Sequence, residues 1–238
     1  MKTFKDLNVK IFADGADIKD MRALASQKWI KGLTTNPTLM AMAGIKSYEH
    51  FAKTVLKYIT DKPISFEVFS DEHDEMEKQA REIATWAKNV YVKIPVTNTK
   101  GVFSGPIIKN LSSEGIKLNV TAIFTVNQVK NVCNCLEKNV PSNVSVFAGR
   151  IADAGIDPLP IMQESLKLVN SVGSSELIWA SPREVFNIVQ ADQINCHIIT
   201  VTASLLKKLP NIGKNLDEFS LDTVKMFYND AHRSGYSI

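Results

Sequence analysis

One lysine lies inside a short apolar segment, Val90-Tyr91-Val92-Lys93-Ile94-Pro95, whose residues are typical of a buried β-strand closed by proline. A buried ammonium is costly to desolvate, so a lysine in a strand interior is usually either paired with a charge or used in chemistry. Desolvation favours the neutral amine, which can attack a carbonyl carbon. On residue type alone, a paired structural lysine is favoured over a nucleophile.

Eight strand-like segments alternate with longer amphipathic segments along the chain. Strands are expected at residues 9–13, 31–34, 64–69, 90–94, 117–121, 144–147, 177–180 and 195–200. Helices are expected at residues 18–27, 48–58, 71–87, 103–113, 126–138, 159–171, 183–189 and 203–209, with a last helix near 216–233. Eight βα units in series predict an α/β fold, a closed (β/α)8 TIM barrel. An open, doubly wound sheet is disfavoured because no G-x-G-x-x-G motif follows the first strand.

The length of 238 residues suits one barrel, since such barrels typically take about 250 residues. We therefore predict a single domain over residues 1–238, with residues 216–238 as a C-terminal helical extension. The net charge is +3, and the lysines are scattered without a basic run, which disfavours a nucleic-acid partner. No stretch approaches 18 apolar residues and residues 1–10 have no apolar core, so we expect neither a membrane span nor a signal peptide. Three cysteines without a CxxC pair are typical of free thiols in a reducing cytoplasm.

The direction of Lys93 predicts which side chains share its site. Alternate residues of a barrel strand point inward, and active sites lie at the carboxyl ends of the strands. If Lys93 points inward, polar residues from seven consecutive strands meet at one end of the barrel. They are Asp14, Thr34, Asn36, Glu67, Asn119, Thr121, Ser145 and Ser181, and Phe147 shares the face of Ser145. This convergence favours a catalytic site over packing.

Each of these side chains alone also has an ordinary structural explanation. Asp14 could cap a helix. Thr34 and Asn36 could belong to a turn. Glu67 could be the ion-pair partner of Lys93.

Two arginines follow the expected sixth and seventh strands. Arginine suits phosphate oxygens, and barrels often hold phosphate near strands seven and eight. A loop salt bridge is about as good an explanation for Arg150. Arg183 could be a solvated residue at a helix start, but a cation there opposes the helix dipole, which favours a bound anion.

Four motifs together resemble the short transaldolases, class I aldolase-type enzymes closely related to the fructose-6-phosphate aldolases. They are Phe12-Ala13-Asp14-Gly15-Ala16-Asp17, Leu33-Thr34-Thr35-Asn36-Pro37-Thr38, Val92-Lys93-Ile94-Pro95 and Phe147-Ala148-Gly149-Arg150-Ile151. The resemblance runs from about residue 9 to the C-terminus. It implies a (β/α)8 barrel that works through a lysine Schiff base without metal or other cofactor. One departure is Gly15, where the family usually has threonine; glycine loosens the backbone next to Asp14.

The resemblance implies a role for each matching residue. Lys93 matches the Schiff-base lysine, and Asp14 matches the acid/base that acts on the C4 hydroxyl of the sugar. Glu67 and Thr121 match the pair that holds a water for proton transfer. The substrate-binding matches are Asn36, Asn119 and Ser145 for the dihydroxyacetone part, with Thr34 beside them, Phe147 over the site, and Arg150, Ser181 and Arg183 for phosphate.

The implied activity is that of a transaldolase, which moves a dihydroxyacetone unit between sugar phosphates. Sedoheptulose 7-phosphate and glyceraldehyde 3-phosphate would give erythrose 4-phosphate and fructose 6-phosphate, in the pentose phosphate pathway. Glu67 and Phe147 favour this activity, because the fructose-6-phosphate aldolases usually have glutamine and tyrosine there. The alternatives are such an aldolase, a transaldolase for another C6-anionic ketose, or a non-catalytic barrel that serves as an assembly module. In the family the last helix can reach a neighbouring subunit, so we expect a homo-oligomer.

Overall fold

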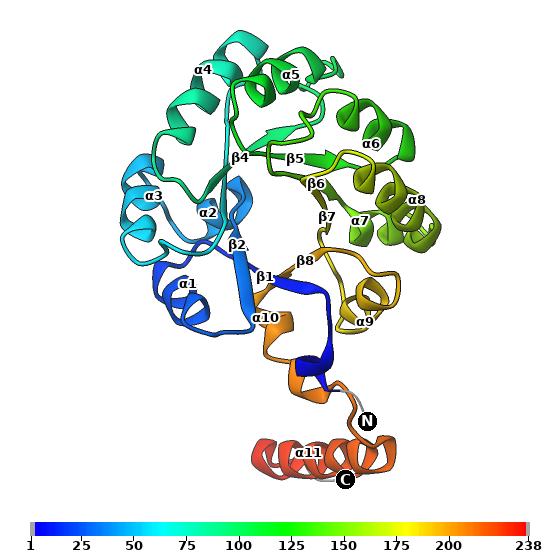
Figure 1. Cartoon of the computed structure of the whole chain (residues 1–238). Helices are drawn as coiled ribbons and strands as arrows, with labels where there is room; N and C mark the ends of the chain where they lie inside the picture. Colours follow the sequence, from blue (N-terminus) through cyan, green and yellow to red (C-terminus); the bar gives the residue numbers. More distant parts are fainter. Residues whose placement is uncertain (1–2, 237–238) are drawn as a thin grey trace.

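The computed structural model describes residues 3–236, so the predicted domain limits at residues 1 and 238 lie outside the described residues. Eight parallel strands pair in chain order, and β8 pairs with β1 to close a barrel (Figure 1). The strands are β1 (Lys10–Asp14), β2 (Ile30–Thr34), β3 (Ile64–Glu67), β4 (Val90–Pro95), β5 (Leu118–Ile123), β6 (Ser142–Val146), β7 (Ser175–Trp179) and β8 (Ile198–Thr202). The predicted (β/α)8 TIM barrel is therefore confirmed.

Helices surround this barrel, and one further helix at the C-terminal end of the chain extends away from it (Figure 1). They are α1 (Ile18–Ala25), α2 (Pro37–Met42), α3 (Tyr48–Leu56), α4 (His73–Ala84), α5 (Gly105–Ser113), α6 (Val126–Cys133), α7 (Ala148–Asp153), α8 (Pro158–Asn170), α9 (Phe186–Gln193), α10 (Ala203–Leu206) and α11 (Leu216–Ser234). Two 3-10 turns, η1 (Phe4–Asp6) and η2 (Leu209–Asn211), lie outside this alternation. The short helices α2 and α7 were not predicted, because six residues are too few to show a helical period.

The predicted helix over residues 183–189 was wrong at its start. Helix α9 begins at Phe186, because Asn187 Oδ1 accepts hydrogen bonds from the amides of Arg183 and Glu184 and closes a turn before the helix. The predicted strand over residues 195–200 also begins later, at Ile198. Asn195 has a left-handed backbone with φ of 58°, and this turn delays the strand.

Short capping signals set several helix starts. Thr125 and Gln128 form a reciprocal capping box at the start of α6, as a threonine followed three residues later by glutamine predicts. Asp157 caps α8, and Pro158 occupies its first turn. These local bonds place the helices that cover the outside of the barrel.

The barrel separates two apolar layers by strand parity. Outward residues such as Val92, Ile94 and Val120 belong to the large core between strands and helices. Phe12, Ile178, Ala180 and Ile198 form a second cluster inside the barrel. Inward and outward residues therefore alternate along the strands as predicted, except at register shifts such as the one between Val120 and Ile123 on β5, which both belong to the outer core.

The inner cluster forms a floor under the carboxyl ends of the strands. A Cβ at Gly32 would lie 2.4 Å from the ring of Phe12, so glycine on β2 leaves room for this ring. Lys10 and Glu176 form an ion pair at the amino ends of β1 and β7. The polar residues near Lys93 thus lie above an apolar layer that separates them from this ion pair.

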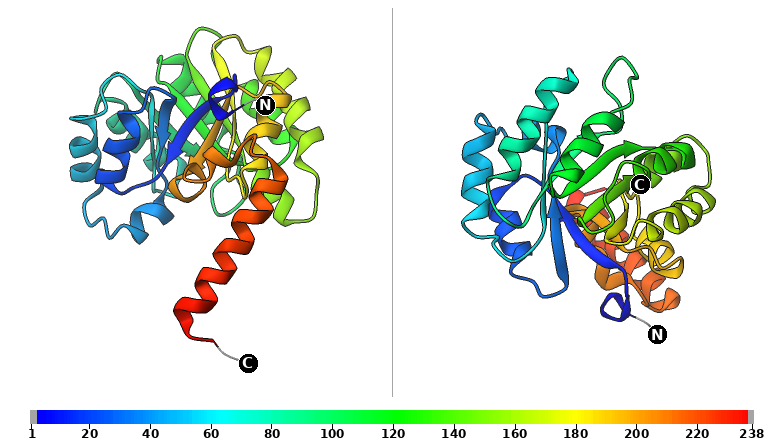
Figure 2. Two further views of the ribbon diagram at one scale, coloured as in Figure 1. Left: turned by 90° about the horizontal axis from the view of Figure 1, so that it is seen from below. Right: turned by 45° about the horizontal axis from the view of Figure 1, so that its top comes forward.

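Helix α11 extends away from the barrel (Figure 2), and none of its residues is buried. Asn215 caps its start, and Gly235 ends it with a left-handed backbone. Within residues 3–236, no helix combines the length and the apolar character that crossing a membrane requires.

Candidate active site

Lys93 lies at the centre of a row of polar side chains on three neighbouring strands. The register pairs Glu67 with Lys93 and Lys93 with Asn119. Lys93 is 7% exposed, its Nζ lies 3.4 Å from Glu67 Oε2, and it donates a hydrogen bond of 3.1 Å to the carbonyl oxygen of Thr35. The ion pair expected as the ordinary explanation is present, and it brings a buried amine next to a carboxylate that can exchange protons with it.

Asp14 ends β1 and is held by two neighbouring side chains. Thr34 Oγ1 donates to Asp14 Oδ1 over 2.8 Å, and Asn36 Nδ2 donates to Asp14 Oδ2 over 3.4 Å. Burial raises the pKa of Asp14 above its ordinary value, opposed by the charge of Lys93 and by these two hydrogen bonds. A carboxyl with a raised pKa that lies in the field of a lysine is suited to acid/base work.

Asp14 could have been a helix cap and Asn36 a turn residue, but the structure gives the capping role to Asn36. Helix α1 is capped by Asp17, so Asp14 is not a helix cap. Asn36 does cap α2, because its Oδ1 accepts from the amide of Leu39 over 2.9 Å, while its Nδ2 faces Asp14. The same amide therefore fixes a helix start and orients the carboxylate.

Thr200 on β8 belongs to this group, and the sequence analysis missed it. Its hydroxyl lies 2.5 Å from Thr34 Oγ1, inside the barrel. Because Thr34 gives its single hydroxyl proton to Asp14, Thr200 is the donor in this contact. Inward parity along β8 was the signal that could have identified it.

Asn119, Ser145 and Ser65 form a buried hydrogen-bond chain beside Lys93. Ser145 Oγ donates to Asn119 Oδ1 over 2.7 Å, and Asn119 Nδ2 donates to Ser65 Oγ over 2.9 Å. Thr121 Oγ1 is also buried and has no hydrogen-bond partner among residues 3–236. These groups offer hydroxyl and amide contacts to a small polyhydroxylated molecule.

An aromatic pair lies at the edge of the site. The ring centroids of Phe147 and Phe124 lie 5.8 Å apart, and the guanidinium of Arg150 lies 5.7 Å from the centroid of Phe147. Phe124, which follows β5, was not predicted as a site residue, because an exposed phenylalanine carries no periodic signal.

Arg183 has a partner that the sequence did not indicate. Its guanidinium forms a fork with the carboxylate of Asp153, which lies at the end of α7. These hydrogen bonds hold the pKa of Asp153 below its ordinary value, and the charge of Arg150 adds to the effect. Because α9 starts three residues after Arg183 and Asp153 supplies an anion, the helix dipole no longer favours a bound anion here. The assignment of Arg183 to phosphate stays a prediction.

Ser181 lies against the start of α7 through a close backbone approach. A Cβ at Gly149 would lie 1.6 Å from the carbonyl oxygen of Ser181, so only glycine fits there. Ser181 itself has a left-handed backbone with φ of 61°. This contact brings the loop after β7 next to the helix that carries Arg150.

At Gly15, by contrast with Gly149, no close contact requires glycine. A Cβ added to it would meet nothing within 4 Å, so packing does not require glycine after Asp14. A cavity of about 310 Å³ opens here, lined in part by Asp14, Gly15, Leu39 and Met42.

Within residues 3–236, no group of three or more histidine, cysteine, aspartate or glutamate side chains is placed to hold a metal ion. The cysteines Cys133, Cys135 and Cys196 are free, and burial raises the pKa of the Cys196 thiol to about 12. The expectation that the protein works without metal or other cofactor stays a prediction.

Comparisons with known proteins place this chain in one family. A family model described as Transaldolase/Fructose-6-phosphate aldolase matches residues 11–238. A protein of Listeria monocytogenes named "Probable transaldolase 2" is 35% identical over 218 residues, which cover 90% of this chain and 95% of that protein. A "Probable transaldolase" of Thermoanaerobacter is 36% identical over 90% of this chain and 96% of its own length. A "Probable transaldolase" of Bdellovibrio bacteriovorus is 31% identical over 95% of this chain and 99% of its own length.

A solved structure shares the fold alone. It is a protein from Coccidioides immitis described as a member of the dihydrodipicolinate synthase family, with a TM-score of 0.60 and 11% identity. The match covers 94% of this chain and 77% of that one.

Proposed function

Because the chain belongs to the transaldolase/fructose-6-phosphate aldolase family, we propose that it is a transaldolase that works through a Schiff base on Lys93. The observation that carries the proposal is the buried Lys93 amine, 3.4 Å from the Glu67 carboxylate and within the electrostatic influence of Asp14. An amine and two carboxylates on one inner face supply a nucleophile and two proton-transfer groups.

The proposed reaction begins with the neutral amine of Lys93. Its Nζ attacks C2 of a ketose phosphate, and loss of water gives an iminium. Asp14 takes the C4 hydroxyl proton, the C3–C4 bond breaks, and its electrons pass into the iminium to give an enamine. An aldose phosphate leaves, while three carbons stay bound to Lys93.

The second half reverses these steps with another aldehyde. The enamine carbon attacks the acceptor aldehyde, Asp14 returns its proton to the new alkoxide, and water hydrolyses the iminium. We assign the protons of imine formation and hydrolysis to a water between Glu67 and Thr121. The free Thr121 hydroxyl supports this, since it has bonding capacity that no side chain among the described residues uses.

Substrate contacts follow from the polar network around the amine. We assign Asn36, Asn119, Ser145 and the neighbouring Thr34 to the dihydroxyacetone hydroxyls, under the ring of Phe147. Arg150, Ser181 and Arg183 are assigned to the phosphate. Arg183 must then share its guanidinium with Asp153 or leave it when phosphate binds.

We favour transfer over simple aldol cleavage because Glu67 and Phe147 stand where the fructose-6-phosphate aldolases usually have glutamine and tyrosine. A phenol beside the enamine could protonate it and release free dihydroxyacetone, whereas the phenyl ring of Phe147 has no proton to give. The enamine then persists until an acceptor arrives. Sedoheptulose 7-phosphate and fructose 6-phosphate are the proposed ketoses, in the pentose phosphate pathway of the cytoplasm.

Acceptor dependence tests this proposal. With fructose 6-phosphate and borohydride, we expect a three-carbon adduct on Lys93, located by peptide mapping. Without an acceptor, little free dihydroxyacetone should form, and erythrose 4-phosphate should start turnover. Steady release of free dihydroxyacetone would favour the aldolase, and absence of any adduct would favour the non-catalytic assembly module.

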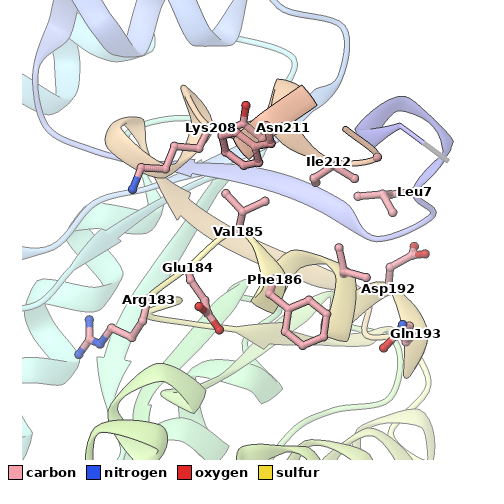
Figure 3. Close-up of a pocket in the computed structure, with 13 residues that line it drawn as sticks. Leu7, Arg183, Glu184, Val185, Phe186, Asp192, Gln193, Lys208, Asn211 and Ile212 are labelled. Carbon is pink, nitrogen blue, oxygen red and sulfur yellow. The ribbon is translucent and has the colours of Figure 1, made fainter. Parts of the chain in front are cut away.

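We also propose that the protein is a homo-oligomer built through α11. Val224 and Phe227 on this helix are 60% and 63% exposed, which is unfavourable for apolar side chains of a monomer. A cavity of about 650 Å³ near the base of α11 adds to this apolar surface. Leu7, Val185, Phe186 and Ile212 line it, while the Arg183 guanidinium points away from them (Figure 3).

Charges on the apolar side of α11 should dissociate the oligomer. We expect Val224→Glu or Phe227→Glu to lower the molar mass measured by size-exclusion chromatography with light scattering, because a buried carboxylate would be unpaired. The matched control is Asn229→Ala, which should keep the native mass because this exposed residue lies on the side of the helix away from Val224 and Phe227. A native protein that runs as a monomer would remove the proposal.

A further inference from the structure

Tyr48 is a residue of α3 whose hydroxyl binds the backbone of Glu67 twice. The Tyr48 hydroxyl accepts a hydrogen bond of 2.6 Å from the Glu67 amide and donates one of 2.9 Å to the Glu67 carbonyl oxygen. One side chain thus satisfies both backbone groups of the residue whose carboxylate faces Lys93.

The two Tyr48 hydrogen bonds replace the backbone hydrogen bonds that would otherwise continue between β2 and β3. The amide of Thr35 donates to the carbonyl oxygen of Ser65 over 3.2 Å. In a regular parallel ladder, the Glu67 amide would next donate to the carbonyl oxygen of Thr35. Instead, the Glu67 amide donates to Tyr48, and the Thr35 carbonyl accepts from Lys93 Nζ over 3.1 Å.

On the side of β3 that faces β4, the hydrogen bonds beside Glu67 remain regular. Glu67 is in register with Lys93, and the amide of Val68 donates to the Lys93 carbonyl oxygen over 3.1 Å. The break is therefore confined to the side that faces β2. It releases one backbone carbonyl, and that carbonyl points at the amine.

We propose that Tyr48 is a positioning residue of the Schiff-base lysine. Its hydroxyl takes the place of the Thr35 carbonyl as partner of the Glu67 backbone, which leaves this carbonyl to orient Lys93 Nζ and holds the Glu67 carboxylate beside it. Tyr48 acts through Glu67 and Thr35 and does not touch the reacting atoms.

The ring of Tyr48 is held firmly enough for this task. Its centroid lies 4.3 Å from that of Phe69, 5.6 Å from that of Trp86 and 6.1 Å from that of Phe66, all in edge contacts. Burial raises the pKa of Tyr48 well above its ordinary value, so the hydroxyl keeps the proton that it donates.

The Tyr48→Phe variant tests the proposal, because it removes the hydroxyl and keeps the ring. The inference rests on the proposed function, so the native protein is first shown to form the borohydride-trapped adduct. In the variant, kcat and the rate of trapping should fall about tenfold or more, the effect of one misplaced hydrogen-bonded group. KM for fructose 6-phosphate should change less than about twofold, since the proposed substrate contacts are untouched.

The matched control is Tyr58→Phe, which also removes a tyrosine hydroxyl, but at a residue that is 50% exposed and outside the aromatic cluster around Tyr48. It should leave kcat and the rate of trapping at their native values. A Tyr48→Phe protein with native kcat and native trapping overturns this inference alone. A native protein that forms no adduct overturns the proposed function, and this inference with it.

One measurement needs no variant, should Tyr48→Phe fail to fold. A crystal structure of the native protein with the reduced adduct on Lys93 should keep the Tyr48 hydroxyl within hydrogen-bond distance of both Glu67 backbone groups. A Glu67 amide that donates to the Thr35 carbonyl in that structure would overturn the proposal.

Discussion

Lys93→Met should lose at least about 10⁴-fold in transfer rate, because methionine has no amine to form the iminium. Mass spectrometry after incubation with fructose 6-phosphate and borohydride should show no added mass. Lys93→Arg should fail equally, although it keeps a positive charge beside Glu67, because a guanidinium is not a nucleophile at working pH. Comparison of the two variants separates the loss of the amine from the loss of the charge.

The control for these variants is Lys57→Met, at an exposed lysine on the outside of the barrel. It should keep native activity. Circular dichroism should confirm the fold of each variant, because Lys93→Met leaves the Glu67 carboxylate without its cation. Transfer by a folded Lys93→Met protein within tenfold of the native rate would contradict the mechanism.

Asp14→Asn should lower the transfer rate by about 10²- to 10⁴-fold, the usual effect of removing a general acid/base. Iminium formation at C2 should continue, because Lys93 and Glu67 are intact. Cleavage of C3–C4 should stop, so borohydride should trap a six-carbon adduct in place of the three-carbon one. The mass of the trapped peptide therefore distinguishes a defect at C4 from a defect at C2.

The pH profile gives a second test of Asp14. The carboxylate form is the base, so activity is lost as pH falls through the pKa of Asp14. Because burial raises that pKa, the loss should occur at a pH above 3.8, the ordinary value for aspartate. The residual activity of Asp14→Asn should lack this acid limb, whereas Asp61→Asn, at an exposed residue, should retain it. A native profile whose acid limb falls at or below pH 3.8 would argue against Asp14 as the base.

The sequence by itself determined the barrel and the inward row of polar residues. Both follow from periodic signals: eight alternating segments specify the βα units, and a period of two specifies which strand residues face inward. Lys93, Glu67 and Asn119 could be placed side by side because strand parity is a local property of the chain.

Tertiary structure alone decided which partners these residues have. The fork between Arg183 and Asp153 joins the loop before α9 to the end of α7, 30 residues apart, and Thr200 reaches Thr34 across 166 residues. Neither contact has a periodic signature, because each depends on where separate elements meet in space.

Tyr48 shows most clearly which contacts the sequence could not predict. In the sequence it is one more aromatic residue of an amphipathic helix, and its helical period is fully explained by packing. Only the closed barrel brings its hydroxyl to the Glu67 backbone, where it replaces a ladder bond and leaves the Thr35 carbonyl to the lysine. Periodicity fixes which face a side chain occupies, but the hydrogen bonds that it makes there depend on the packing of elements that are distant in the chain.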